Sequence, residues 1–113
     1  MNISRFQAKF ILEDKLLAGK PFNNFPILYE IRGPLDTAVL RQALSAIMAT
    51  HDSMRARFPE VEGVLSLVLE ESADPPFEVV HLDNEAAIEA FSREFVLRPF
   101  HLASEPPHRT ALV

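Results

Sequence analysis

The sequence lacks cysteine and has only three glycines among its 113 residues. Without cysteine there can be no disulfide bond, no thiolate nucleophile and no Cys-ligated metal. Three scattered glycines cannot build a glycine-rich phosphate loop or a Gly-x-Ser-x-Gly nucleophile elbow. The N-terminus has no signal-peptide core, and no apolar run approaches the ~20 residues of a membrane span. We therefore expect a cytoplasmic protein that has no membrane partner and carries out neither thiol nor phosphate chemistry.

Positive charge is also scarce, with 11 Lys and Arg against 16 Asp and Glu and a formal net charge of -5. No basic cluster reverses this balance locally, so nucleic acid is not an expected partner. An acidic stretch around residues 60–74 is interpreted as a solvated loop face. The histidines are not placed at metal-ligand spacing, so we expect no metal site. They are His51, His81, His101 and His108.

The composition that remains, 48% hydrophobic and 24% charged residues, is typical of one globular domain. A capping box of Ser4 and Gln7 predicts a helix over about 4–17, which Gly19 and Pro21 should stop. Alternating apolar residues predict a half-buried strand over 25–32. Asp36 is a good N-cap for the most regular helix, which should fade near His51.

The sequence of the second half of the chain predicts a turn, two strands, a third helix and a final strand. Glu62 and Gly63 form the expected turn, and the nearly all-apolar run 64–69 predicts a central strand covered on both faces. A short strand is expected over 77–82, then a helix that Asn84 caps and that ends near Arg98, and a final strand over 109–113. Together these elements predict an α/β fold of the two-layer α+β kind, with a mixed sheet packed by about three helices.

The segment 50–58, directly after the most regular helix, is the most distinctive part of the chain. Arg55 and Arg57 are two residues apart, so in an extended segment both could point the same way. One guanidinium could hold a buried carboxylate by a bidentate pair, but surface arginines with a structural role are the more frequent case. The residues by themselves leave both interpretations open.

Four segments in order carry a resemblance to one family. Residues 4–12 are similar to the motif Ser-x-Ala-Gln-x-Arg, with Phe6 in place of Ala and Lys9 in place of Arg. Residues 32–44 are similar to the strand exit Arg-Gly-x-Leu-Asp and the helix that follows it. Residues 99–102 resemble Pro-Phe-Asp-Leu, with His in place of Asp.

The fourth segment, 50–58, looks like the motif Arg-His-Glu-x-Leu-Arg-Thr-x-Phe. His51, Arg55 and Phe58 match it, and the other positions depart from it at small cost. Over nearly its full length the chain thus resembles the N-terminal portion of condensation domains of nonribosomal peptide synthetases. The resemblance implies a chloramphenicol-acetyltransferase-like fold, of which residues 1–113 would be a single partial domain, the first part of one lobe.

The same resemblance implies a function that depends on residues outside this chain. The family's His-His-x-x-x-Asp-Gly motif would lie beyond Val113, so we expect the natural polypeptide to continue and the chain to contain no catalytic residue. Arg55, with His51, would support the active site by pairing with the aspartate of that motif. The reaction would join a carrier-bound thioester donor to a carrier-bound amine acceptor through an amide bond. Relatives that epimerise, cyclise or form esters share these early motifs and are not distinguished by them.

The substrates would arrive on the phosphopantetheine arms of peptidyl or acyl carrier proteins, so no directly bound cofactor is expected. Further expected partners are the remainder of the condensation domain and the adjacent synthetase domains. By itself the chain should be inactive. One alternative is a noncatalytic condensation-like module for docking or self-association, with a homodimer formed through an exposed strand edge at residues 111–113. Another is an unrelated small α/β binding protein.

Overall fold

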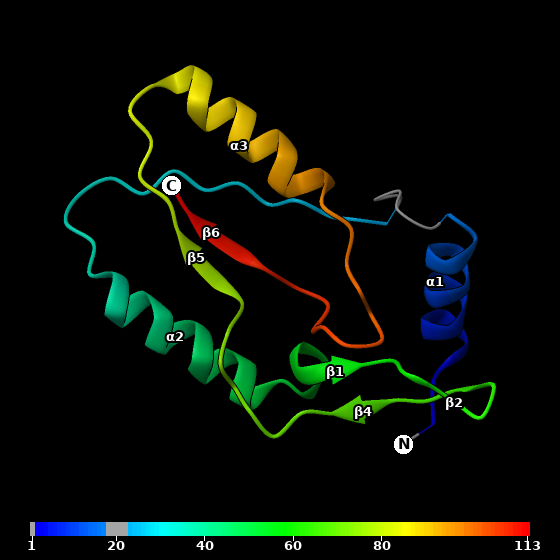
Figure 1. Ribbon diagram of the computed structural model, residues 1–113. Helices are drawn as coiled ribbons and strands as arrows, with labels where there is room; N and C mark the ends of the chain where they lie inside the picture. The colour runs from blue at the N-terminus through cyan, green and yellow to red at the C-terminus, as the bar shows by residue number, and fades with distance from the viewer. Residues whose placement is uncertain (1, 18–22) are drawn as a thin grey trace.

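The computed structural model describes residues 2–17 and 23–113, and three α-helices organise it (Figure 1). They are α1 (Arg5–Leu16), α2 (Thr37–Thr50) and α3 (Glu85–Leu97), and a 3-10 turn, η1 (Asp52–Arg55), follows α2. No helix among the described residues has the length and apolarity that crossing a membrane requires.

Side-chain caps begin all three helices where the sequence predicts them. The Ser4 hydroxyl accepts from the Gln7 N–H at 3.1 Å, and the Gln7 side chain accepts from the Ser4 N–H at 2.8 Å. Asp36 accepts from the N–H groups two and three residues further on, at 2.9 and 3.3 Å. Asn84 accepts from the Ala87 N–H at 2.8 Å. The capping box and both N-caps are confirmed, while the predicted stop of α1 at Gly19 and Pro21 lies outside the described residues.

The strands form three separate two-stranded sheets. β1 (Ala56–Arg57) pairs antiparallel with β4 (Val68–Leu69), and β2 (Glu60–Val61) pairs antiparallel with β3 (Val64–Leu65). β5 (Phe77–Val79) and β6 (Thr110–Leu112) lie side by side and parallel between α2 and α3 (Figure 1). The predicted mixture of helices with parallel and antiparallel strands is confirmed, but the described strands do not join into one sheet.

The turn between β2 and β3 is the one that the sequence predicts. Glu62 and Gly63 both have positive φ, 52° and 76°, as the two central residues of a type I′ hairpin turn require. Glycine adopts this conformation without steric cost because it has no Cβ. The local residues therefore fix this hairpin.

The prediction of a central strand over 64–69 is wrong. The run divides into β3 and β4, each with a single partner, and Val64 is 64% exposed. On the opposite strand Pro59 has no N–H to donate, so one bond of the antiparallel ladder is missing there, although the Ser66 N–H still donates to the Pro59 carbonyl at 2.9 Å. The run is not central because, among the described residues, no strand pairs with it on its other side.

The prediction of a strand over 25–32 is also wrong for the described structure. The segment has no strand partner among the described residues, and Phe25 and Leu28 are 86% and 89% exposed. The Asn24 side chain fixes the start of the segment by donating to the carbonyls of Val96 and Arg98, at 3.0 Å each. An alternating sequence becomes a strand only when a neighbour supplies the ladder.

The predicted outer strands are nearly correct. β5 ends at Val79, before the predicted end at residue 82, although the Val80 N–H still donates to the Leu112 carbonyl at 2.8 Å. β6 forms within the predicted range 109–113.

The core of the described chain is small. Its buried apolar residues are Ile11 of α1, Met48 of α2, Ala56 of β1, Phe77 of β5 and Pro75 just before β5. The accessible surface of 8456 Å² exceeds the roughly 6,200 Å² of a folded monomer of this mass. The radius of gyration of 15.8 Å likewise exceeds the about 13 Å of a compact domain of this length. Much apolar surface therefore stays uncovered.

Candidate functional site

The candidate site is the turn that connects α2 to β1. The His51 N–H still donates to the Ile47 carbonyl at 3.0 Å, but the residue itself has an extended conformation that ends α2. Its carbonyl then accepts from the Met54 N–H at 3.0 Å, which closes η1. This turn places Arg55 beside the end of α2.

The Arg55 guanidinium connects three segments. Its Nε donates to the Met48 carbonyl at 3.0 Å, its Nη1 to the Glu70 carbonyl at 2.8 Å, and its Nη2 to the Asp52 carboxylate at 2.5 Å. The Met48 carbonyl belongs to the last turn of α2, where carbonyls lack helical partners and a cation is favourable. In return, the Glu70 N–H donates to the Arg55 carbonyl at 2.8 Å. Arg55 therefore joins the end of α2 to the residue after β4.

The described residues contain no buried carboxylate that pairs with either arginine. Only 16% of the Arg55 side chain is exposed, but its carboxylate partner Asp52 is 67% exposed and makes one contact, so no bidentate pair with a buried carboxylate forms. Arg57 pairs with the Glu70 carboxylate instead. Within the described residues Arg55 therefore binds backbone carbonyls and one exposed carboxylate, and these contacts use three of the five N–H donors of its guanidinium.

His51 lies next to this cluster but does not join its hydrogen bonds. The residue is exposed, and its imidazole makes no hydrogen bond to any of residues 2–17 or 23–113. The resemblance assigns both residues to active-site support. The side chain of Arg55 is held by several hydrogen bonds, whereas His51 takes part in the turn through its backbone N–H and carbonyl.

A second cluster, which the sequence analysis missed, lies against the first. His108 Nε2 is 3.0 Å from the Met54 carbonyl oxygen. Burial lowers the pKa of His108 below its usual value, and the hydrogen bond to Met54 only partly opposes this effect. The imidazole is therefore neutral at neutral pH. No local signal in the sequence marks this contact, because the partners are 54 residues apart.

Arg109 fixes the backbone next to His108. Its guanidinium donates to the carbonyls of Arg98 and Pro99 at 2.9 and 2.8 Å, and its Cζ lies 3.8 Å from the centroid of the Phe100 ring. Desolvation by burial lowers the pKa of Arg109, which stays charged because arginine titrates far above neutral pH. An isolated arginine between a Pro-Pro pair and an apolar strand is a signal that could have identified this residue.

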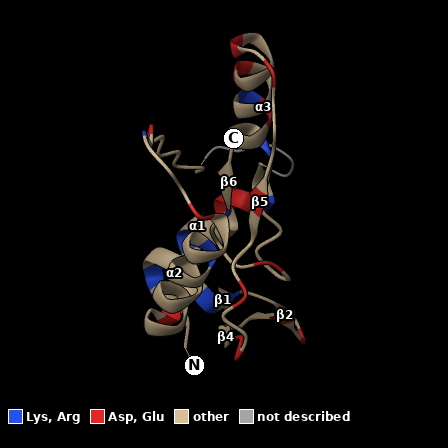
Figure 2. Ribbon diagram, turned by 90° about the vertical axis from the view of Figure 1, so that its left-hand side faces the viewer, with Lys and Arg blue, Asp and Glu red and all other residues tan. Residues whose placement is uncertain are grey.

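The other charged residues that the structure describes are spread over the surface. In the described residues no group of three or more His, Asp and Glu side chains could hold a metal ion. Basic and acidic residues are interspersed along the chain, as the colours of the ribbon show (Figure 2). The acidic stretch around 60–74 is exposed, as expected, and several of its carboxylates form ion pairs, including Glu60 with Lys15 of α1.

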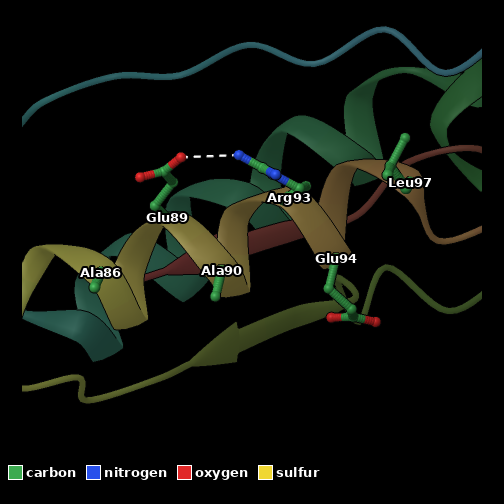
Figure 3. A pocket seen from close by; sticks show the side chains of 6 residues that line it. All are labelled: Ala86, Glu89, Ala90, Arg93, Glu94 and Leu97. Atoms are coloured by element: carbon green, nitrogen blue, oxygen red, sulfur yellow. Dashed lines mark hydrogen bonds and ion pairs between the residues drawn. The ribbon is translucent and has the colours of Figure 1, made fainter.

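A shallow hollow runs along one face of α3 (Figure 3). Figure 3 shows that Glu89 and Arg93 point toward one another across the helix surface, with 2.9 Å between their paired atoms. Arg98 lies four residues after Glu94 and donates hydrogen bonds to its carboxylate. This contact lowers the pKa of Glu94 and raises the pKa of Arg98. These i,i+4 pairs at the surface stabilise the helix slightly and do not assemble a reactive site.

Comparison with known proteins assigns the family. The family model described as "Condensation domain" matches residues 1–113. The chain belongs to the condensation-domain family. It is 31% identical over 109 residues to Cyclosporin synthetase simA of Tolypocladium inflatum, which covers 95% of this chain. It is 28% identical over 107 residues to Bassianolide nonribosomal cyclodepsipeptide synthetase of Beauveria bassiana, covering 95% of the chain, and 28% identical over 111 residues to Bacitracin synthase 2 of Bacillus licheniformis, covering 98%.

The chain spans only 1%, 3% and 4% of the lengths of these three relatives. The match of the family model confirms the family that the four motifs indicate. Membership implies a chloramphenicol-acetyltransferase-like fold, and the three helices with their mixed strand pairs agree with that class.

Proposed function

We propose that this condensation-domain chain is the N-terminal part of an enzyme that forms amide bonds in nonribosomal peptide synthesis, and that it is inactive by itself. Residues 1–113 then constitute a single partial domain, and the His-His-x-x-x-Asp-Gly motif follows Val113. The observation that carries the proposal is the family match over the whole chain, together with relatives that are synthetases many times longer. The excess of uncovered apolar surface supports it, since further parts of the domain would cover that surface.

In the proposed reaction the amine of the acceptor attacks the thioester carbonyl of the donor. A C–N bond forms, the C–S bond breaks, the donor carrier's thiol leaves, and the amine nitrogen loses a proton. Phosphopantetheine arms on peptidyl or acyl carrier proteins present both substrates, so the chain holds no cofactor itself. The chain's own contribution is alignment, because a bound and oriented pair of reactants reacts much faster than two free ones.

Arg55 is the proposed positioning residue within this chain. Its contacts with the Met48 and Glu70 carbonyls set the direction of the guanidinium before any partner arrives. Its two remaining N–H donors can bind the aspartate of the following motif, which would otherwise be a buried and unpaired charge. His51, which ends α2 at the start of this turn, supports the same backbone.

The test is an amide-formation assay with the native polypeptide that contains this chain, one carrier loaded with an acyl thioester and a second loaded with an amino acid. We expect Arg55→Ala to lower kcat about tenfold or more, which corresponds to one lost charge-assisted contact. Arg93→Ala is the matched control, because Arg93 is 71% exposed and its ion pair joins it only to Glu89. The 113-residue chain alone should give no product.

Two results would contradict the proposal. One is amide product from the 113-residue chain alone. The other is a kcat for Arg55→Ala equal to that of Arg93→Ala while circular dichroism shows both variants folded.

A specific observation favours a second candidate, a noncatalytic module that docks on a second copy of itself. The uncovered surface exceeds that of a folded monomer by about 2,200 Å², which is enough for a stable dimer interface. Among the described residues β6 has a strand partner on one side only: the Thr110 N–H and the Leu112 carbonyl bond to the β5 side, so the Ala111 N–H points to the other side.

Light scattering after size exclusion, at tens of micromolar protein, separates the two candidates. A dimer that Ala111→Pro dissociates and Ala111→Val preserves would support pairing through β6, because only proline removes the edge donor. A monomer at all concentrations would contradict the second candidate and leave the first unaffected.

A further inference from the structure

The Met54 carbonyl is a backbone acceptor that its own turn cannot satisfy. η1 is a single 3-10 turn, and β1 begins at Ala56, so no later N–H of the turn is placed to reach this carbonyl. A half-buried carbonyl without a donor destabilises the fold. The donor in this structure is His108 Nε2, at 3.0 Å.

The contact defines the state of the imidazole. A carbonyl oxygen only accepts hydrogen bonds, so Nε2 must carry the proton, which selects the Nε2–H tautomer of the neutral ring. Partial burial of the ring lowers the pKa of His108, which favours this neutral form.

The backbone that carries His108 is held on both sides. Pro106 and Pro107 restrict the chain before it. Arg109 is fixed after it by the carbonyls of Arg98 and Pro99. The imidazole therefore extends from a rigid segment, and β6 begins two residues later at Thr110.

A second link runs parallel to the first. The Phe58 N–H donates to the Leu102 carbonyl at 2.6 Å, so the segment 99–108 contacts the chain on both sides of Arg55, at Met54 and at Phe58. Of the two links, only the one from His108 uses a side chain, and it is the one adjacent to the arginine.

We propose that His108 is a positioning residue, which holds the Arg55 turn in register with β6 by donating its Nε2–H to the Met54 carbonyl. The link itself is a property of this fold, whereas its effect on catalysis rests on the proposed function. In that reaction His108 would act through Arg55 and would touch neither substrate.

The link is tested first in the native polypeptide that contains this chain, by hydrogen exchange of single amides. The informative amides are those of Met54, which closes η1, and Glu70, which donates to the Arg55 carbonyl. We expect His108→Leu to accelerate exchange of both about tenfold, and His108→Gln, which keeps a side-chain N–H, to restore most of the protection. His101→Leu is the matched control, because His101 is exposed and lies on the same segment.

The Ile88 amide in α3, which donates to the Asn84 carbonyl, distinguishes a local effect from global unfolding. Faster exchange of the Met54 and Glu70 amides in His108→Leu, with unchanged exchange of the Ile88 amide, supports the link. Equal acceleration at Ile88, or no acceleration at Met54 and Glu70, would overturn it. An Nδ1–H tautomer of His108 in nitrogen-15 NMR spectra would overturn it as well.

The catalytic consequence is tested in the native polypeptide. His108→Leu should lower kcat about fivefold or more without changing KM for the loaded carriers, and His108→Gln should recover most of the loss. The double variant with Arg55→Ala should be no slower than Arg55→Ala alone, because both changes act through the same arginine. Unchanged kcat in His108→Leu would refute the positioning role. A wild-type polypeptide that forms no amide would refute the proposed function, while the exchange experiment would still decide the link.

Discussion

Replacing Arg55 with alanine is the substitution that should destabilise this fold most among the surface-accessible arginines. The guanidinium serves two backbone carbonyls, Met48 and Glu70, and each hydrogen bond from a charged donor contributes about 1.5–3 kcal/mol. The third contact, to the 67% exposed Asp52, contributes roughly 0–1 kcal/mol because solvent screens it. Water replaces part of the lost bonding at this half-buried site, so we expect Arg55→Ala to lower the free energy of unfolding by about 2–4 kcal/mol.

Urea denaturation followed by circular dichroism measures this loss, with the slope of the transition checked for constancy. Asp52→Ala and Arg57→Ala are the controls, because each removes a solvent-screened ion pair, and both should cost less than about 1 kcal/mol. Equal losses for Arg55→Ala and Asp52→Ala would refute the reasoning, since the ion pair and not the carbonyl contacts would then carry the stability.

Three further predictions follow from particular contacts. Asp36→Ala should cost about 1 kcal/mol of stability by removing the N-cap of α2, and Asp36→Asn should cost less, both measured by urea denaturation. Gly63→Ala should cost about 1 kcal/mol, because φ of 76° is strained for a residue with Cβ, and thermal denaturation should show a lower midpoint. Stability should also fall as the pH drops below about 6.5. The pKa of His108 is lower in the folded chain, so below that pH the unfolded chain binds a proton at this imidazole more readily than the folded chain does. Denaturation midpoints across this range should show a shallower pH dependence for His108→Gln, and an unchanged slope would contradict the assignment.

Local chemistry made the helices and the hairpin turn predictable. Ser4 with Gln7, Asp36 and Asn84 each satisfy N–H groups within three residues, so their effect is contained in a short stretch of sequence. Glu62 and Gly63 likewise set the hairpin by their own conformations. These features appear in the structure where the sequence places them.

The strands were less predictable because a strand requires a partner that lies far away in the sequence. The segment 25–32 has the alternation of a strand and no ladder among the described residues, while 64–69 is paired on one side only and its ladder lacks the bond that Pro59 cannot donate. The site shows the same limit. Arg55 could be selected from a motif, but its partners Met48 and Glu70, and the contact of His108 with Met54, depend on the folded arrangement.

The family, the three capped helices and the turn at Glu62 and Gly63 follow from the sequence, because each depends on residues close together or on motifs in order. The pairing of the strands, the open face and the contacts that connect Arg55 to His108 through Met54 follow from the folded arrangement alone. These contacts join residues 7 to 54 positions apart, and hydrogen bonds over such distances form only where the whole chain brings donor and acceptor within about 3 Å.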